Sequence, residues 1–306
     1  MKIYEFCPYY NEAVVTNIKI EENSGWVDEL HLVEANRTFR FDPKPYHFSP
    51  NHPAPENKTG ANSTVVYHKL DGDRLFRGKT HWGPSHFFPY FRKKDSARTN
   101  EMIQRNHVHQ VLHPDDDDIV ILSDIDEIID SRHADYVVDM ARRHGIITVR
   151  LHHTLFFLNL YSQNWHEIWD GGNAPRDYSY RTFVMTGRHF NALPYKSDRL
   201  RRKGEANKLA SSITCLPEIT GFHHSWLGDA ASIAGKIKAY SHSLSDHSAD
   251  IIDANTGEIS TDKIRDLVRG RKSIFAGHQL EIRPPDDPPM LGAITRNMAE
   301  YSKFMI

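Results

Sequence analysis

The sequence predicts an α/β fold with a mostly parallel central sheet. Near the N-terminus, a strand pattern at residues 2–7 is followed by a helical pattern at 13–23 and by a second strand pattern at 29–34. This order is typical of parallel strands joined by a right-handed crossover. Further along, residues 119–122 (IVIL) are all apolar. Such a short apolar run indicates a central parallel strand that is buried on both faces.

The remaining elements complete this pattern. They are expected in the following order: a loop rich in Pro, Asn and His at 42–64, a strand at 65–68, helices at 95–112 and 131–144, a strand at 146–161, and helices at 231–244, 261–270 and 290–305. Gly145 marks the end of the helix at 131–144, because glycine is the commonest residue just past a helix C-terminus. We predict one domain over residues 1–290, with a C-terminal helix at 291–306 packed on it.

Composition and charge narrow the class of protein. Apolar residues make up 39% and charged residues 25% of the 306 residues, as in soluble globular proteins. The formal net charge of −2 gives no general attraction to nucleic acid. No apolar stretch approaches the roughly 18 residues that a membrane span needs, and no secretory signal is recognisable. We therefore expect a cytoplasmic protein with no membrane span and no nucleic-acid partner. The 20 histidines favour a metal site.

Acidic residues directly follow the apolar run at 119–122, in Ser123-Asp124-Ile125-Asp126-Glu127. In open α/β sheets, ligands bind outside the carboxyl ends of the strands. A divalent ion there would neutralise buried carboxylates and hold a substrate diphosphate. The Asp-x-Asp spacing lets one carboxylate reach the ion and the other reach a ribose hydroxyl or a metal-bound water. The alternative is a solvated acidic turn, which is our expectation for residues 115–118 on the other side of the strand.

Four sequence blocks resemble glycosyltransferase family 17. They are residues 27–48 (VDELHLVEANRTFRFDPKPYHF), 117–128 (DDIVILSDIDEI), 221–226 (GFHHSW) and 263–270 (KIRDLVRG). The resemblance implies a GT-A-like fold and an inverting glycosyltransferase that depends on Mn²⁺ or Mg²⁺. It also implies UDP-N-acetylglucosamine as the donor and a carbohydrate or glycoconjugate as the acceptor.

The same resemblance implies roles for single residues at the metal site. Asp124 and Asp126 would be the Asp-x-Asp pair, with Asp126 as the direct metal ligand. His223, in the block at 221–226, would complete the coordination, and imidazole is an acceptable ligand for Mn²⁺. A structural role for His223 is the alternative, as for any single histidine.

Further residues are implied on the donor side. Glu34 and Asn36, past the second strand, would face the nucleoside, and Arg37 would help to hold it; a capped strand end is the alternative. A basic cluster at 199–203, which includes Arg202, either contacts the diphosphate through charge-assisted hydrogen bonds or forms a solvated hairpin.

The acceptor side depends on residues 150–220, where the resemblance is weak. An inverting transfer needs a carboxylate that takes the acceptor proton. We expect this base to be Glu167, with Asp170 as the second choice, because Trp165 and Trp169 beside them suit the face of a sugar. Two other functions remain open. One is a metal-dependent phosphoesterase or nucleotidyltransferase that uses the same acids, and the other is a non-catalytic carbohydrate-binding protein.

Overall fold

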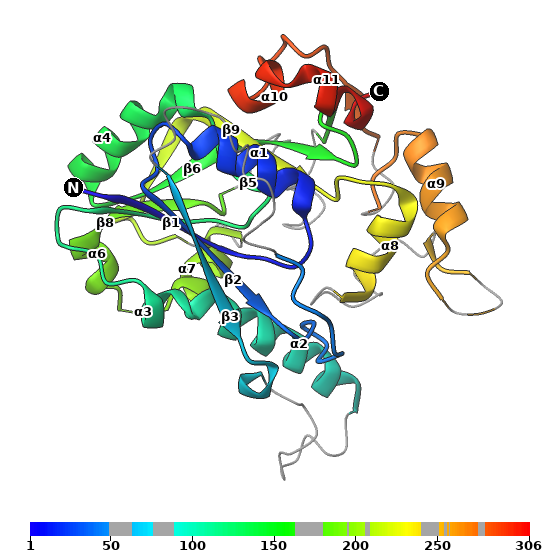
Figure 1. Cartoon of the computed structure of the whole chain (residues 1–306), viewed down its shortest axis with the longest axis horizontal. Helices are drawn as coiled ribbons and strands as arrows, with labels where there is room; N and C mark the ends of the chain where they lie inside the picture. The colour runs from blue at the N-terminus through cyan, green and yellow to red at the C-terminus, as the bar shows by residue number, and fades with distance from the viewer. Residues whose placement is uncertain are drawn as a thin grey trace.

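One sheet runs through the computed structural model and joins strands from both ends of the chain (Figure 1). The structure describes residues 1–48, 63–75, 89–162, 180–194, 196–205, 209–239, 251–253, 256, 258–274 and 279–306. The strands are β1 (Ile3–Pro8), β2 (Glu29–Ala35), β3 (Thr64–Leu70), β4 (Ile119–Leu122), β5 (Glu127–Ile129), β6 (Ile146–Leu155), β7 (Leu160–Tyr161), β8 (Phe183–Thr186), β9 (Thr214–Ser225) and β10 (Glu281–Ile282).

Helices of very different lengths surround this sheet. They are α1 (Ala13–Asn23), α2 (Pro89–Asn106), α3 (Val108–Val111), α4 (Ala134–His144), α6 (Gly187–Asn191), α7 (Ser197–Glu205), α8 (Ala230–Ala239), α9 (Thr261–Arg269), α10 (Gly292–Arg296) and α11 (Met298–Tyr301). Short 3₁₀ turns occur at Gly72–Arg74, Ser131–His133 and Ser302–Phe304. Among the described residues, none of the helices combines the length and the apolar character that crossing a membrane requires.

The N-terminal part of the sheet is parallel. Strands β3, β2, β1 and β4 lie side by side in that order, and each neighbouring pair is parallel. Strand β8 continues the sheet antiparallel to β4, and β6, β7 and β10 follow. Because β1, β2 and β4 point the same way, the residues that follow them meet at one edge of the sheet. The predicted α/β fold with parallel central strands is confirmed.

Strand β4 is covered on both faces, which explains its unbroken apolar sequence. Ile119 and Ile121 pack in the same core cluster as Val137 of α4. Val120 and Leu122 point the opposite way and belong to a second cluster, formed with α3 and α7. Side chains alternate between the two faces of a strand, so a strand between two helical layers must be apolar at every position.

Several predicted boundaries agree with the structure, and others differ. Helix α1 occupies the predicted residues 13–23, and α4 ends where Gly145 takes a positive φ of 80°. The helix predicted at 95–112 is instead α2, which ends at Asn106, followed by the separate turn α3. The short strand β5 and most of the elements between residues 180 and 225 were not assigned from the sequence.

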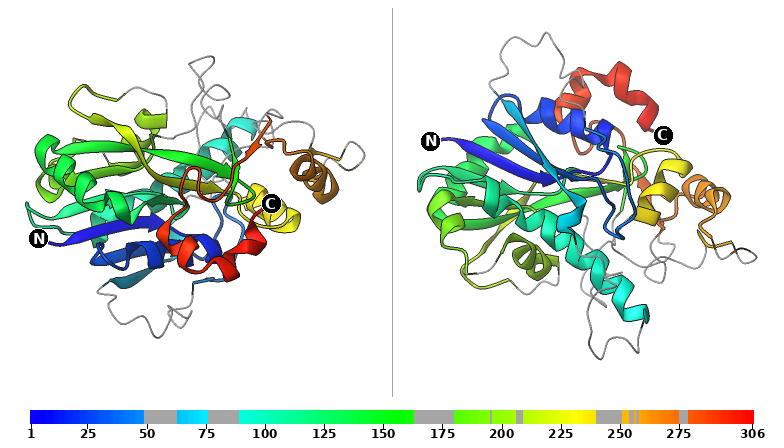
Figure 2. Two further views of the ribbon diagram at one scale, coloured as in Figure 1. Left: turned by 90° about the horizontal axis from the view of Figure 1, so that it is seen from above. Right: turned by 60° about the horizontal axis from the view of Figure 1, so that its bottom comes forward.

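The predicted C-terminal helix at 290–305 is wrong, because this segment forms α10, α11 and a 3₁₀ turn. Asn297 stands between the two helices with φ −120° and ψ 37°, outside the helical region. Its side-chain amide donates to the Glu21 carboxylate at 2.6 Å and to the Ala293 carbonyl at 3.0 Å. The bond to Glu21 ties this break in the helix to α1, and the bond to Ala293 closes the end of α10. Figure 2 shows the C-terminal segment, in red, lying against α1, in blue.

Glu22 of α1 forms a second contact with the C-terminal segment, and a substitution there tests how much this contact contributes to stability. This carboxylate is 1% exposed and accepts hydrogen bonds from the Ser131 amide at 2.9 Å and from the Ala293 amide at 2.7 Å. In Glu22→Gln, one acceptor oxygen is replaced by an amide that faces backbone donors. We expect the free energy of unfolding, measured in urea, to fall by about 1–3 kcal/mol. Glu300→Gln, at an exposed position, is the control, with an expected change within about 0.5 kcal/mol. Equal effects would contradict this assignment.

Candidate functional site

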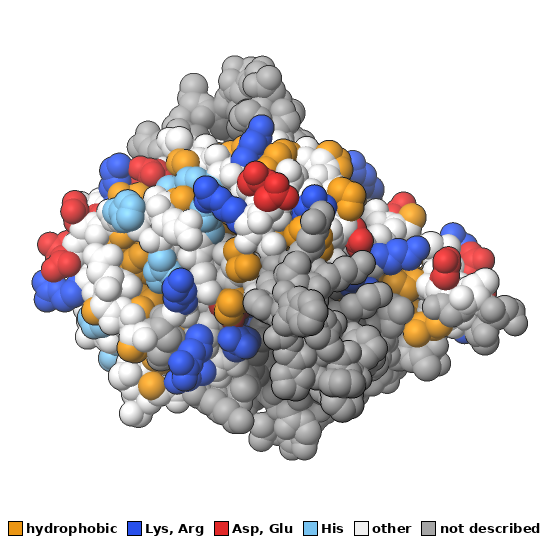
Figure 3. Space-filling view, turned by 90° about the horizontal axis from the view of Figure 1, so that it is seen from below, with side chains coloured by type: hydrophobic (Ala, Val, Ile, Leu, Met, Phe, Trp, Pro, Cys, Tyr) orange, Lys and Arg blue, Asp and Glu red, His pale blue; other side chains and the backbone are white. Residues whose placement is uncertain are grey.

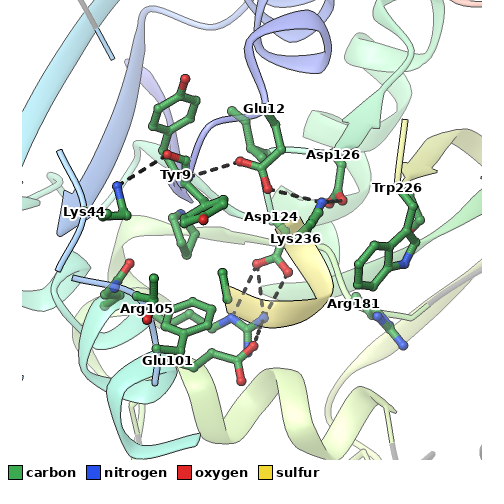
Figure 4. Close-up of a pocket in the computed structure, with 18 of the residues that line it drawn as sticks. Tyr9, Glu12, Lys44, Glu101, Arg105, Asp124, Asp126, Arg181, Trp226 and Lys236 are labelled. Atoms are coloured by element: carbon green, nitrogen blue, oxygen red, sulfur yellow. Dashed lines mark hydrogen bonds and ion pairs between the residues drawn. The ribbon is translucent and has the colours of Figure 1, made fainter. Parts of the chain in front are cut away.

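A pocket opens at the carboxyl ends of β1, β2 and β4 (Figure 4). Its walls come from segments far apart in the sequence: Pro8, Tyr9, Tyr10 and Glu12 after β1; Arg37, Thr38, Phe39 and Lys44 after β2; Glu101, Gln104 and Arg105 on α2; Asp124, Ile125 and Asp126 after β4; Arg181; and His223, Ser225, Trp226, Lys236 and Ala239 around β9 and α8. The predicted acids therefore lie where ligands bind in open α/β sheets.

Asp126 faces two basic side chains in this pocket. Its Oδ1 lies 3.5 Å from Nε2 of His223, and its Oδ2 lies 3.3 Å from Nζ of Lys236. The same ammonium lies 3.1 Å from Oε1 of Glu12, so Lys236 bridges two carboxylates. Ser225 Oγ lies 2.7 Å from His223 Nε2 and fixes the direction of the ring. Burial lowers the pKa of His223, which favours the neutral imidazole that can act as a ligand.

Asp124 has different partners. Its Oδ2 accepts from Arg105 at 2.9 Å and from Arg201 at 2.6 Å. Figure 4 shows the Asp124 carboxylate turned toward Arg105, while that of Asp126 is turned toward Lys236. Burial favours the neutral form of Asp124, but the two guanidinium groups outweigh it and lower the pKa. Asp124 is thus a charged carboxylate that organises basic side chains at the pocket floor.

Glu127, the third acid of the sequence motif, is a structural residue. Its side chain has no exposed surface and accepts two hydrogen bonds of 2.8 Å from Arg201. It also accepts from the Thr182 hydroxyl and from the Asp124 amide, both at 3.0 Å. Burial opposes ionisation, but Arg201 more than compensates, and the pKa of Glu127 lies well below its ordinary value. Glu127 therefore fixes both Arg201 and the backbone at Asp124.

A buried lysine, Lys19, holds the segment that carries the acids. Lys19 of α1 is completely buried, and its Nζ donates to Glu5 at 2.6 Å and to Ser123 at 2.8 Å. The same ammonium reaches the carbonyl of Asp124 at 3.1 Å. Such an ion pair needs well-placed hydrogen bonds to offset the cost of desolvation. Lys19 thereby joins α1 and β1 to the end of β4.

Pairing of the short strand β5 with the end of the long strand β9 brings His223 to Asp126. Strand β5 runs antiparallel to β9, with Glu127 opposite His223, and the His224 amide donates to the Asp126 carbonyl at 2.8 Å. Gly221 permits this close approach, because a Cβ there would lie 2.1 Å from the Ile128 carbonyl oxygen.

Asp126 and His223 fit one side of a metal site. A carboxylate oxygen and an imidazole nitrogen are donors suited to Mn²⁺, and their separation of 3.5 Å is compatible with neighbouring ligands of one ion. Among the described residues, no group of three or more His, Cys, Asp or Glu side chains gathers as a metal site. Water or diphosphate oxygens would therefore supply the other ligands, as is common for Mg²⁺ sites.

The other histidines have different environments. His224 is 2% exposed and its Nδ1 lies 2.8 Å from the Thr154 hydroxyl. Burial lowers its pKa to about 3. His113, His144 and His189 are exposed, and Figure 3 shows histidine side chains, in pale blue, on the face seen from below. Among the described histidines, exposed side chains are a minority, and His31, His107 and His153 are buried like His223 and His224.

Of the three residues predicted to face the nucleoside, Arg37 lines the pocket and Glu34 and Asn36 do not. Glu34 is completely buried and is ion-paired to Lys44, and it accepts from the amides of residues 47 and 48. Asn36 accepts from the Gly72 amide at 2.6 Å. Both side chains are used to hold loops next to the pocket.

The basic cluster at 199–203 belongs to helix α7, so the predicted hairpin is wrong. Arg202 is 57% exposed, pairs with Asp198 and is not among the pocket residues. Arg201, its neighbour, is 5% exposed and carries the contacts to the acids. The signal was available in the sequence, since Leu200, Arg201 and Gly204 share one face at helical spacing. Glu167 and Asp170, the predicted bases, lie outside the described residues.

Most pocket residues were not singled out from the sequence, among them Glu12, Arg105 and Lys236, which come from different segments. Trp226 closes the block at 221–226 but was given no role. Trp226 carries one visible sign in the backbone, a φ of 60°. Left-handed backbone in a bulky residue is costly and is concentrated at functional sites.

Comparison with known proteins gives a family and several structural likenesses. The family model of glycosyltransferase family 17 matches residues 1–172, more than half of the chain. No curated protein matches the sequence. Similar solved structures include the galactosyltransferase LgtC (11% identity, 70% of this chain and 73% of that chain, TM-score 0.34) and S. aureus TarS (13%, 80% and 68%, 0.33). Another is 4-diphosphocytidyl-2C-methyl-D-erythritol synthase (9%, 71% and 90%, 0.35). At these TM-scores the structural likenesses support no statement about activity.

The role of Arg201 in holding the acids can be tested by stability. In Arg201→Met, Glu127 keeps its buried charge without the partner that neutralises it. We expect the free energy of unfolding to fall by about 3–5 kcal/mol in urea denaturation. Arg202→Met removes the same charge one residue away, at an exposed ion pair with an expected effect of roughly 0–1 kcal/mol. A similar loss in the two variants would refute the structural role of Arg201.

Proposed function

Because the chain belongs to glycosyltransferase family 17, we propose that this pocket binds a nucleotide-sugar donor and transfers its sugar, with inversion, to a hydroxyl of a carbohydrate or glycoconjugate. The observation that carries the proposal is the pairing of Asp126 with His223 at the carboxyl end of β4, beside Arg105 and Lys236. Oxygen and imidazole donors next to basic side chains suit a metal-bound diphosphate.

In this proposal Asp126 and His223 would hold Mn²⁺ or Mg²⁺, and the ion would supply positive charge to the nucleoside diphosphate as it leaves. Arg105 lines the pocket while its charge is fixed by Asp124 and Glu101. A guanidinium held in this way can contact phosphate oxygens without being reoriented. Asp124 then acts on the donor through Arg105, and Arg202, on the exposed side of α7, has no place in the diphosphate contact.

We propose that the nucleoside binds between the segments that follow β1 and β2. Tyr10, Arg37, Thr38 and Lys44 line this side of the pocket. The Lys44 ammonium lies 5.2 Å from the centre of the Tyr10 ring, and its position is set by Glu34. Glu34 therefore acts as a positioning residue for Lys44, while the Asn36 side chain holds the neighbouring turn at Gly72. UDP-N-acetylglucosamine is the proposed donor.

The acceptor hydroxyl needs a base to take its proton as the bond to the anomeric carbon forms and the bond to the diphosphate breaks. Glu167, with Asp170 as the second choice, remains the proposed base. Trp226 at the edge of the pocket offers an apolar face of the kind that sugars stack against.

Sugar transfer can be tested with Asp126→Asn. This variant keeps the shape of the side chain and weakens the metal site. We expect release of UDP from UDP-N-acetylglucosamine to require Mn²⁺ or Mg²⁺ and to fall by about 100-fold or more in the variant. Asp117→Asn, in the exposed acidic turn before β4, is the matched control and should keep full activity. Undiminished turnover in excess EDTA would exclude the proposed mechanism. Release of UMP and N-acetylglucosamine 1-phosphate in place of UDP would favour a phosphoesterase.

The nucleoside is tested separately by calorimetry. UDP, GDP and CDP are titrated into the protein in the presence of Mn²⁺, and UDP is expected to bind most tightly. Arg37→Met should weaken UDP binding by roughly 10-fold, because it removes a charge-assisted contact on the nucleoside side. Tighter binding of GDP than of UDP would make the donor assignment wrong, while sugar transfer itself would still stand.

A further inference from the structure

Lys236 occupies the position next to the proposed metal ligand. Its ammonium lies 3.3 Å from Asp126 Oδ2 and 3.1 Å from Glu12 Oε1, and Figure 4 shows it between the two carboxylates. The ammonium also lies 5.4 Å from the centre of the Trp226 ring. Trp226 directly follows β9, and its backbone is in the left-handed conformation. Helix α8 thus brings a cation to one oxygen of Asp126 while the other oxygen faces His223.

Glu12 is fixed independently of Lys236. Its Oε2 accepts from the amides of Tyr10 at 3.1 Å and Asn11 at 3.0 Å, which leaves Oε1 for the ammonium. The side chains of Lys236, Glu12 and Asp126 are 16%, 14% and 11% exposed. Water therefore screens these charges only partly. Two cations next to the Asp126 carboxylate, such as the Lys236 ammonium and a metal ion, would repel each other strongly.

Resting on the proposed function, we infer that Lys236 and the divalent ion compete for the Asp126 carboxylate until the donor diphosphate gives the ammonium a new partner. Without the donor, the ammonium neutralises Asp126 and repels a second cation. When a nucleoside diphosphate enters, its oxygens accept from Lys236, and Asp126 becomes available to the ion. Metal and donor then bind cooperatively, and Lys236 contacts the leaving diphosphate.

This coupling predicts how Lys236→Met behaves when Mn²⁺ and UDP are titrated separately and together by calorimetry. Mn²⁺ alone should bind roughly 5-fold or more tightly to the variant than to the unmodified protein. UDP without metal should bind more weakly by a comparable factor, and each ligand should strengthen the other less. Lys236→Arg, which keeps the charge, should resemble the unmodified protein.

Lys238→Met is the matched control, because Lys238 lies on the same helix, is exposed and does not line the pocket. Thermal melts verify that each variant is folded, and Lys236→Gln replaces the methionine variant if that does not fold. If the protein binds both Mn²⁺ and UDP but Lys236→Met changes neither affinity, the competition is refuted and the proposed function stands. If Lys236→Arg behaves like Lys236→Met, charge is not the cause and the inference is wrong. If the unmodified protein binds neither ligand, the proposed function and the inference both fail.

Discussion

Neutralisation of the acids at the end of β4 is the constraint on which the site depends. Asp124, Asp126 and Glu127 lie within four residues, and each is at least four-fifths buried. Charges of one sign at this density are unstable in a protein interior unless each has a partner. The structure supplies a cation to each of them, from α2, α7 and α8, and a further ion pair between Lys19 and Glu5 lies beneath.

These partners divide the acids into two groups with different consequences. Glu127 and Asp124 share Arg201 in a buried network of short, charged hydrogen bonds. Among the described residues, the Asp126 carboxylate has single, longer contacts to His223 and Lys236. Asp124 is held firmly, whereas the partners of Asp126 can be replaced. This arrangement suits a ligand that must be bound and released. The two aspartates of one short motif thus have different partners.

Local patterns in the sequence were sufficient to predict some of the helices and strands. Strand β4 could be predicted because it is apolar and buried at every position. The bounds of helix α1 were also predicted, although its buried residues include Lys19, Glu21 and Glu22, whose burial the sequence does not indicate. The place of the acids followed from β4, and His223 followed from the resemblance in the block at 221–226. Contacts formed between distant segments could not be predicted: whether Glu34 faces the pocket depends on Lys44, and the partner of Asp126 depends on where α8 packs. In α7, charge alone does not distinguish Arg202 from Arg201, and only the structure shows that Arg201 is the buried one.

The attachment of the C-terminal segment to α1 has a consequence for the order of assembly. Glu21 and Glu22 bond to residues 271 to 276 positions later in the chain, and Asn159 bonds both backbone groups of Ile306. Helix α1 carries Lys19, so the segment that supports the acids is itself covered by residues 293–297, which lie far from it in the sequence. Such contacts close very long loops, which slows folding. The pocket therefore acquires its full support only after residues 293–297 have docked on α1, and a substitution in that segment would act on a site that is distant in the sequence.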